Sequence, residues 1–190
     1  MFAVGLSELF TNLLKFYIGR LRPNFYELCG FDPAILACAA DPEDVRQARM
    51  SFPSGHSSLS FCSLSVVAWF LLGRSGIAAR RGRWSSRRWE SALAALPLKA
   101  RAVASACGPW GMASIVAASR LVDNWHHPSD VIAGSMLGFA VGTFAYHLWY
   151  SHILSPDAGV PRNALNAEVT PATTGDRVLQ KRSFFGDLSV

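Results

Sequence analysis

The sequence is poor in cysteine, in lysine and in charged residues of either sign. Its 190 residues include four cysteines, with neither a CxxC pair nor a His/Cys cluster of zinc-ligand spacing, so nothing in it indicates a zinc site. Charged residues make up 16% of the chain and hydrophobic residues 51%, and a soluble domain of this length is rarely so apolar. The shortage of charge therefore favours a single domain embedded in a membrane.

The N-terminus lacks two features of a secretory signal peptide. Its first residues are apolar, but there is no basic n-region and no small-residue cleavage site, so we do not interpret it as a signal peptide. The chain also has no internal repeat. We expect a membrane-embedded core over residues 1–150, followed by a largely disordered cytosolic tail over 151–190 that has no apolar periodicity.

Four apolar segments approach the roughly 20 residues that a membrane-spanning helix needs. The first is interrupted by Glu8, Lys15 and Arg20, whereas the other three contain no Asp, Glu, Lys or Arg. In the last segment glycines recur every fourth residue, at 134, 138 and 142, a spacing that lets another helix approach closely. The sequence therefore predicts an all-α membrane bundle with spans near residues 2–21, 56–73, 102–118 and 131–150.

The two longer connections between these segments differ in charge. Residues 74–101 hold eight basic residues against one glutamate, whereas residues 24–52 are richer in acidic ones. Because short cytoplasmic loops are rich in Lys and Arg, we expect 74–101 in the cytosol and 24–52 on the lumenal or extracellular side. A nucleic-acid patch is the weaker alternative for the basic loop. Residues 88–98 are a candidate interfacial helix. Cys29 and Cys38 could form a disulfide if their loop faces an oxidising compartment.

Three polar clusters fall at the helix ends that this topology places on one membrane face. Lys15 and Arg22 lie near the end of the first helix, where charges often only reach the interface. Residues 53–56, Pro-Ser-Gly-His, begin the second helix. Ser54 could simply cap that helix, but a glycine-containing helix start also exposes amides that bind phosphate.

The third cluster is SRLVDNWHHPSD, residues 119–130. Arg120 could reach the interface and Asp130 could favour a helix start, but two adjacent histidines are harder to explain structurally. Pro128 suits the first position of a helix, so His126 should lie just outside that helix and be free to point into a pocket.

Together the patterns K-x6-R-P, P-S-G-H and S-R-x5-H-x3-D resemble the type 2 phosphatidic acid phosphatases, also called lipid phosphate phosphatases. The resemblance covers about residues 10–150. The stretches RQARMSFPSGHSS and RGRWSSRRWE look most like the diacylglycerol pyrophosphate phosphatase branch. Family members usually have six spans, so this chain would hold about four of them.

The resemblance implies a role for each matched residue. His126 would attack phosphorus and form a phosphohistidine, Asp130 would hold its other ring nitrogen, and His56 would be the acid and base. His127 has no role in the pattern. The implied reaction is independent of metals and uses no cofactor. The residues expected to bind the phosphate are Lys15, Arg22, Ser54, Gly55 and Arg120.

A phosphate pocket at headgroup depth suits a phospholipid phosphate whose tails stay in the bilayer. Phosphatidate and diacylglycerol pyrophosphate are the leading candidates, and lysophosphatidate and prenyl or sphingoid phosphates remain open. Nucleic acid is not expected as a partner, and the oligomeric state is left open. Two alternatives are a non-catalytic membrane interaction protein of the same fold and a vanadate-binding haloperoxidase relative.

Overall fold

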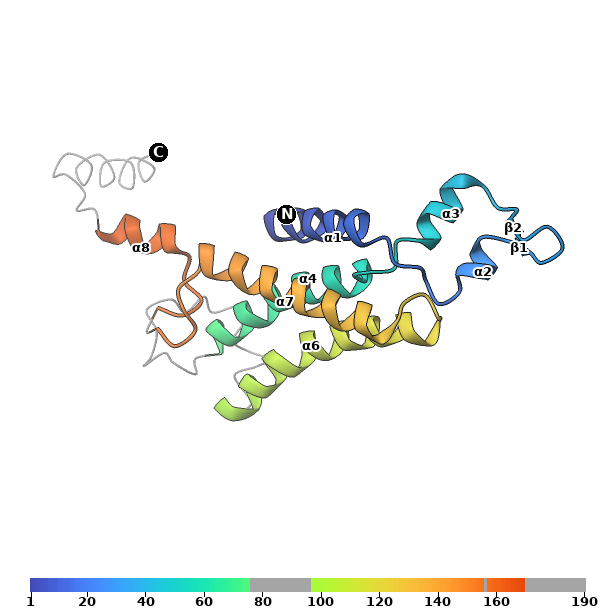
Figure 1. Ribbon diagram of the computed structural model, residues 1–190. Helices are drawn as coiled ribbons and strands as arrows, with labels where there is room; N and C mark the ends of the chain where they lie inside the picture. Colours follow the sequence, from blue (N-terminus) through green and yellow to red (C-terminus); the bar gives the residue numbers. More distant parts are fainter. Residues whose placement is uncertain (76–96, 156, 170–190) are drawn as a thin grey trace, which may run out of the picture.

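The computed structural model describes residues 1–75, 97–155 and 157–169, and this part of the chain is predominantly helical (Figure 1). Two short strands form its only described sheet, a two-residue antiparallel pair with Phe31 opposite Cys38. The elements in chain order are α1 (Phe2–Ile18), α2 (Phe25–Leu28), β1 (Phe31–Asp32), β2 (Ala37–Cys38), α3 (Pro42–Ala48), α4 (Gly55–Arg74), α6 (Leu98–Val122), α7 (Pro128–Trp149) and α8 (Arg162–Val169).

The long helices form a bundle around α4, which packs against α1, α6 and α7. Three helices are long and apolar enough to cross a membrane: α4, most of α6, and α7, with mean hydropathies of 1.4, 1.2 and 1.5. The first predicted span is also a helix, but α1 has 17 residues and is not among these three candidates. The all-α membrane class is therefore confirmed, with three candidate spans in the described chain.

The seam between α4 and α7 is formed by the glycine repeat. A Cβ atom on Gly134, Gly138 or Gly142 would collide with the carbonyl oxygen of Ser54, Ser58 or Cys62, respectively. Each glycine faces a residue 80 positions earlier, so the two helices run parallel in a fixed register, with both N-termini at the same end of the bundle. The predicted close approach is confirmed.

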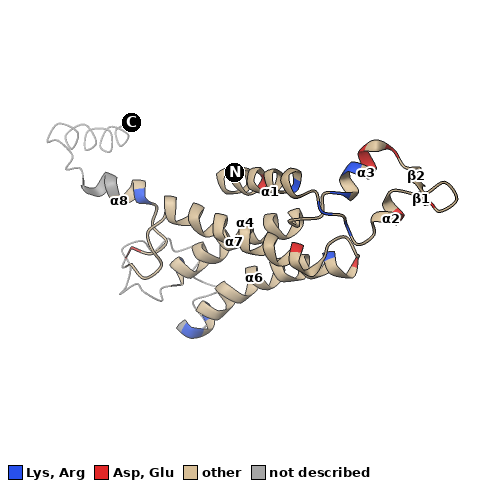
Figure 2. Ribbon diagram, viewed as in Figure 1, with Lys and Arg blue, Asp and Glu red and all other residues tan. Residues whose placement is uncertain are grey.

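The interior of the bundle is small and polar, and its exterior is apolar. Fully buried positions include Ser7, Thr11 and Ser65, whereas large hydrophobic side chains lie exposed along the helices. Thr11 and Ser58 hydroxyls meet at 2.8 Å between α1 and α4, and the Trp69 indole donates to Thr143 at 2.9 Å between α4 and α7. Charged side chains gather toward the ends of the bundle (Figure 2), with Glu8 in α1 as an exception. This distribution suits helices that face lipid.

Residues 25–48 fold into a small cap beyond one end of the bundle (Figure 1). Its buried cluster contains Phe25, Cys29 and Ala48, with Leu28 and Val45 packed against it. Cys29 and Cys38 form a disulfide, as the sequence allowed. The Ala48 carbonyl accepts a hydrogen bond from the Arg22 amide at 2.9 Å, which ties the cap to the chain leaving α1.

The other end of the bundle carries the start of the C-terminal segment. Tyr150 and Pro161 form an isolated antiparallel bridge, and α8 follows within the stretch for which we predicted disorder. The rest of that tail, residues 170–190, lies outside the described residues. So does nearly all of the predicted interfacial helix at 88–98, because residues 76–96 are not described and α6 begins at Leu98.

Candidate active site

The segment between α6 and α7 presents His126. α6 ends at Val122, and Asn124 follows in the left-handed region at φ 54°. The Asn124 amide donates to Leu121 at 3.1 Å and the Trp125 amide to Arg120 at 3.2 Å, a Schellman arrangement that turns the chain sharply. Pro128 is the first residue of α7, as predicted, so His126 lies just before the helix.

The start of α4 lies against the start of α7. Ser54 caps α4, with its hydroxyl accepting from the Ser57 hydroxyl at 3.1 Å and the Ser57 amide at 3.5 Å. Its own amide donates to the Asp130 carbonyl at 3.0 Å. The Ser54 amide is therefore engaged in helix packing, and phosphate binding at Ser54 stays a prediction. Gly55 is the first residue of α4, as predicted, and its role in phosphate binding stays a prediction.

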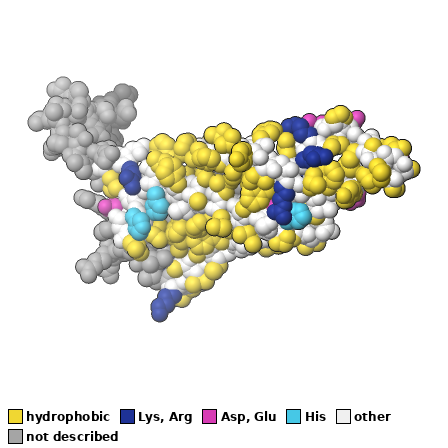
Figure 3. All heavy atoms as spheres, in the orientation of Figure 1, with side chains coloured by type: hydrophobic (Ala, Val, Ile, Leu, Met, Phe, Trp, Pro, Cys, Tyr) yellow, Lys and Arg dark blue, Asp and Glu magenta, His cyan; other side chains and the backbone are white. Residues whose placement is uncertain are grey.

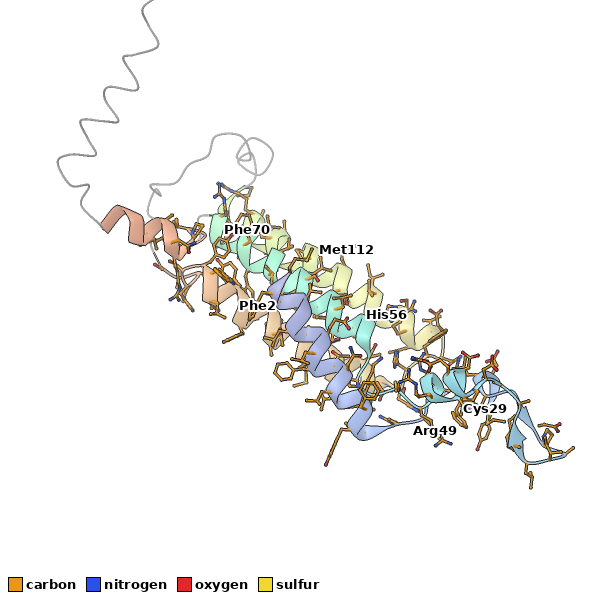
Figure 4. The ribbon with its side chains drawn as sticks, turned by 90° about the horizontal axis from the view of Figure 1, so that it is seen from above. Phe2, Cys29, Arg49, His56, Phe70 and Met112 are labelled. Carbon is orange, nitrogen blue, oxygen red and sulfur yellow. A yellow bond between two sulfur atoms is a disulfide. The ribbon has the colours of Figure 1, made fainter. Side chains whose placement is uncertain are left out.

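His56 and His126 both lie at the end of the bundle that carries the cap. Figure 4 places His56 at this end of α4, on the side of Arg49 and Cys29 and far from Phe70. His56 is exposed, whereas His126 has only 4% of its surface exposed. Because α4 and α7 are parallel, their positive N-terminal ends also meet here and favour an anion.

Two cations of the first motif reach the same place. The Lys15 ammonium lies 3.6 Å from the position of a Cβ atom on Gly55, directly beside the start of α4. Arg22 is buried, and its guanidinium stacks over the Trp125 ring at 4.8 Å from the centroid. Burial lowers the pKa of Arg22. Its Nε is buried without a hydrogen-bond partner among the described residues, which is costly unless a further acceptor meets it.

Arg120 differs from Arg22 in its contacts. Its guanidinium forms an ion pair with Asp123 at 2.9 Å and donates to the Ser119 hydroxyl at 3.1 and 3.2 Å. It is close enough to His56 to contribute to that residue's electrostatic environment. The structure thus brings Arg120 to the site in a paired state, and a bound phosphate would compete with Asp123 for it. Figure 3 shows Lys or Arg beside His on the surface near this end.

The Asp130 carboxylate is fully buried and has three close partners. Oδ1 accepts from Arg20 at 2.7 Å, and Oδ2 accepts from the Ser51 hydroxyl at 2.6 Å and from the His127 amide at 3.0 Å. The His126 Nδ1 atom is 3.9 Å from Oδ2, which is longer than a hydrogen bond. The expected direct contact between Asp130 and the His126 ring is therefore replaced by an arrangement that includes Ser51.

The His126 ring is kept neutral by its surroundings. Its burial, with the nearby charges of Arg22 and Lys15, lowers the pKa to about 4 from 6.5, while the Ser51 backbone and Asp130 act in the opposite direction. Nδ1 faces Ser51, whose hydroxyl lies 3.5 Å away. The other ring nitrogen, Nε2, is thereby left for chemistry at neutral pH.

His127 is placed differently from its neighbour. It is the N-cap residue of α7, and its Nε2 lies 3.2 Å from the Leu21 carbonyl oxygen. Its ring therefore contacts the backbone between α1 and the cap, while its amide donates to Asp130 Oδ2. They give it a structural place, in agreement with its lack of a role in the motif.

The fold and the site define a class: an integral membrane helical protein that gathers histidine, lysine and arginine side chains at one end of its bundle. The family model described as the PAP2 superfamily matches residues 1–153. The chain therefore belongs to the PAP2 superfamily.

Several relatives are similar over most of the chain. A PA-phosphatase related-family protein of Dictyostelium discoideum is 32% identical over 86% of this chain and 52% of its own. Lipid phosphate phosphatase 2 of Arabidopsis thaliana is 29% identical over 85% and 53%. Diacylglycerol pyrophosphate phosphatase 1 of Saccharomyces cerevisiae is 32% identical over 79% and 50%. The chain thus spans about half the length of these relatives. No solved structure matches it.

Proposed function

We propose that the protein is a membrane phosphatase that hydrolyses lipid phosphates through a phosphohistidine intermediate. The observation that carries this proposal is a buried, neutral His126 within the electrostatic reach of Arg22, whose buried Nε has no hydrogen-bond partner among the described residues. A neutral imidazole can act as a nucleophile, and a buried cation without a carboxylate favours a phosphate ligand. Membership of the PAP2 superfamily and similarity to lipid phosphate phosphatases support the same activity.

In the first step, His126 Nε2 attacks phosphorus. A P–N bond forms while the P–O bond to the lipid alcohol, or to the leaving phosphate of a pyrophosphate, breaks. His56 gives its proton to the departing oxygen. Lys15, Arg22 and the Gly55 amide stabilise the charge on the equatorial phosphate oxygens, and Arg120 joins them as it exchanges Asp123 for phosphate.

In the second step, neutral His56 takes a proton from water, and the resulting oxygen attacks phosphorus. The P–N bond breaks, which releases phosphate and restores neutral His126. His56 is exposed at the start of α4 and can exchange its proton with solvent between turnovers. Neither step needs a group beyond the side chains named here and water.

The substrate class follows from the position of the site. The phosphate-binding side chains lie at the ends of helices whose apolar flanks suit a bilayer, so a lipid could bring its phosphate to the site while its tails stay in the membrane. Phosphatidate and diacylglycerol pyrophosphate are the proposed substrates, in line with the yeast relative's name.

The proposed sidedness places the site and the cap outside the cytosol. The support is the charge difference between loops 24–52 and 74–101, although most of the latter lies outside the described residues. In a background without Cys62 and Cys107, Asp44→Cys should react with an impermeant maleimide on intact cells or sealed lumen-out vesicles, and Ser85→Cys only after permeabilisation. Labelling in the reverse pattern would contradict this topology.

Adjacent histidines provide the test of the activity. His126→Ala should abolish release of phosphate from short-chain phosphatidate in detergent micelles, because it removes the proposed nucleophile. His127→Ala is the matched control and should keep substantial activity, since it loses only a contact with the Leu21 carbonyl. Radiolabelled phosphate should be trapped on the wild type by acid quench and be absent from His126→Ala. An active His126→Ala variant beside an inactive His127→Ala variant would refute the mechanism.

A further inference from the structure

We propose that Ser51 and Arg20 are positioning residues for the reaction, with Ser51 standing between the Asp130 carboxylate and the His126 ring. The inference rests on the proposed function, because it concerns how the nucleophile is oriented. Neither residue is among those that the sequence motifs point to. Each acts through another side chain and is not expected to touch the substrate.

The Ser51 contacts carry the first half of the inference. Its hydroxyl is fully buried and donates to Asp130 Oδ2 at 2.6 Å, a short charge-assisted bond. With its proton committed to the carboxylate, the hydroxyl oxygen can only accept from the His126 ring, whose Nδ1 lies 3.5 Å away. Ser51 thus favours the tautomer with the proton on Nδ1 and leaves Nε2 as the nucleophile.

The Arg20 contacts carry the second half. One guanidinium nitrogen donates to Asp130 Oδ1 at 2.7 Å and to the Ser129 hydroxyl at 2.6 Å. Arg20 thereby holds Oδ1 while Ser51 holds Oδ2, and together they fix which carboxylate oxygen faces the His126 ring. The Arg20 backbone adds a second link, because its carbonyl accepts from the Ser51 amide at 2.9 Å. Arg20, Ser51 and Asp130 therefore form one connected unit that spans all three motif regions.

This unit also determines how strongly Asp130 acts on the ring. The charged groups around His126 are Lys15 from α1, Arg22 from the segment after α1, and Asp130 from α7. The Ser51 hydroxyl and the Arg20 guanidinium both offset the carboxylate charge. Removing either one exposes the ring to more of that charge, which raises the pKa of His126. The acid limb of kcat/KM should then move to higher pH.

The experiment compares Ser51→Ala and Arg20→Gln with the wild-type chain on short-chain phosphatidate in micelles. Both variants should lower kcat by about 10- to 100-fold, the range for partners that orient a functional histidine, with little change in KM. Both should shift the acid limb upward. Ser51→Thr, which keeps the hydroxyl, and Arg20→Lys, which keeps the charge, should recover part of kcat and return the limb toward its wild-type position.

Two control variants separate positioning from packing. Ser65→Ala removes another fully buried serine, whose hydroxyl accepts from Trp110 at 3.1 Å in the membrane part of the bundle. Arg46→Gln removes an exposed arginine paired with Glu43 at 2.7 Å in the cap. Both should keep wild-type kcat and pH dependence. Arg20 has 38% of its side chain exposed, so Arg20→Gln carries the test even if Ser51→Ala disturbs folding.

The outcomes are distinct. A kcat loss with an upward shift of the acid limb supports the inference. Wild-type kcat and an unmoved limb in Arg20→Gln and in folded Ser51→Ala overturn it, as does an equal kcat loss in the two controls. If the wild type releases no phosphate, or if His126→Ala stays active, the proposed function itself fails and the positioning roles fail with it.

Discussion

Replacing Gly138 by alanine should separate α4 from α7 and disturb the site at the N-terminal end of the seam. The new Cβ would collide with the Ser58 carbonyl and would also lie 2.8 and 2.9 Å from the Ser58 carbonyl carbon and the Cys62 amide. These are backbone atoms, so no side chain can move aside. Overpacking of this kind costs about 1–3 kcal/mol. The gain from placing alanine instead of glycine in a helix, about 0.5–1 kcal/mol, offsets only part of that cost.

The matched control is Gly111→Ala in α6, because no atom of the described residues lies within 4 Å of the Cβ that it would add. Thermal unfolding in detergent, followed by tryptophan fluorescence, should give a lower Tm for Gly138→Ala than for Gly111→Ala. Activity should fall as well, since a shift near 1 Å between catalytic groups costs roughly 10²-fold in rate. Equal Tm values for the two variants would refute the close-packed seam.

Three further predictions concern pH, the Arg22 stack and the cap. Because the pKa of His126 is lowered to about 4, kcat/KM should decline toward acid pH only as that pKa is approached, and it should decline toward alkaline pH as the proposed acid His56 loses its proton. Stability should also fall as the pH drops from 6.5 to 4, where the unfolded chain binds more protons, and activity and Tm measured across this range check both. Trp125→Ala should raise KM roughly fivefold with little change in kcat, since an Arg–Trp stack contributes about 1 kcal/mol, and Trp125→Phe should restore part of it in steady-state assays. Cys29→Ser should destabilise the cap by about 2–3 kcal/mol, the amount expected for a disulfide that closes a loop with a sequence separation of 9. A reductant should lower the Tm of the wild type in the same way, whereas Cys62→Ser should not.

Local sequence rules predicted the parts of the site that depend on neighbouring residues. Pro128 indicated where α7 begins, and this placed His126 outside the helix. The glycine spacing in α7 predicted a close helix contact, although it did not identify α4 as the partner or the parallel register. The three-motif pattern indicated the family, and the family match agrees with it.

Contacts between distant segments could not be predicted in the same way. Ser51 and Arg20 are 79 and 110 residues from Asp130 in the sequence, and only the tertiary fold brings them together. A serine next to a Phe-Pro pair and an arginine near a helix exit have common structural explanations, so neither gave a separate signal. The hydrogen bond from the Ser54 amide to the Asp130 carbonyl depends on the same fold, so local sequence rules could not predict that this amide already has a partner.

The glycine seam limits how α4 and α7 can move against each other. If α7 slid along α4, each of the three glycines would have to pass a carbonyl oxygen of α4. Only a full change of register would relieve all three contacts. The seam therefore holds His126, Asp130 and the start of α4 in a fixed arrangement. α1 contacts this pair through side chains such as Thr11 on Ser58, which can part and re-form. Among the described helices, α1 and α6 are therefore the ones that can shift against this pair, and such a shift would leave His56 and His126 in register with each other.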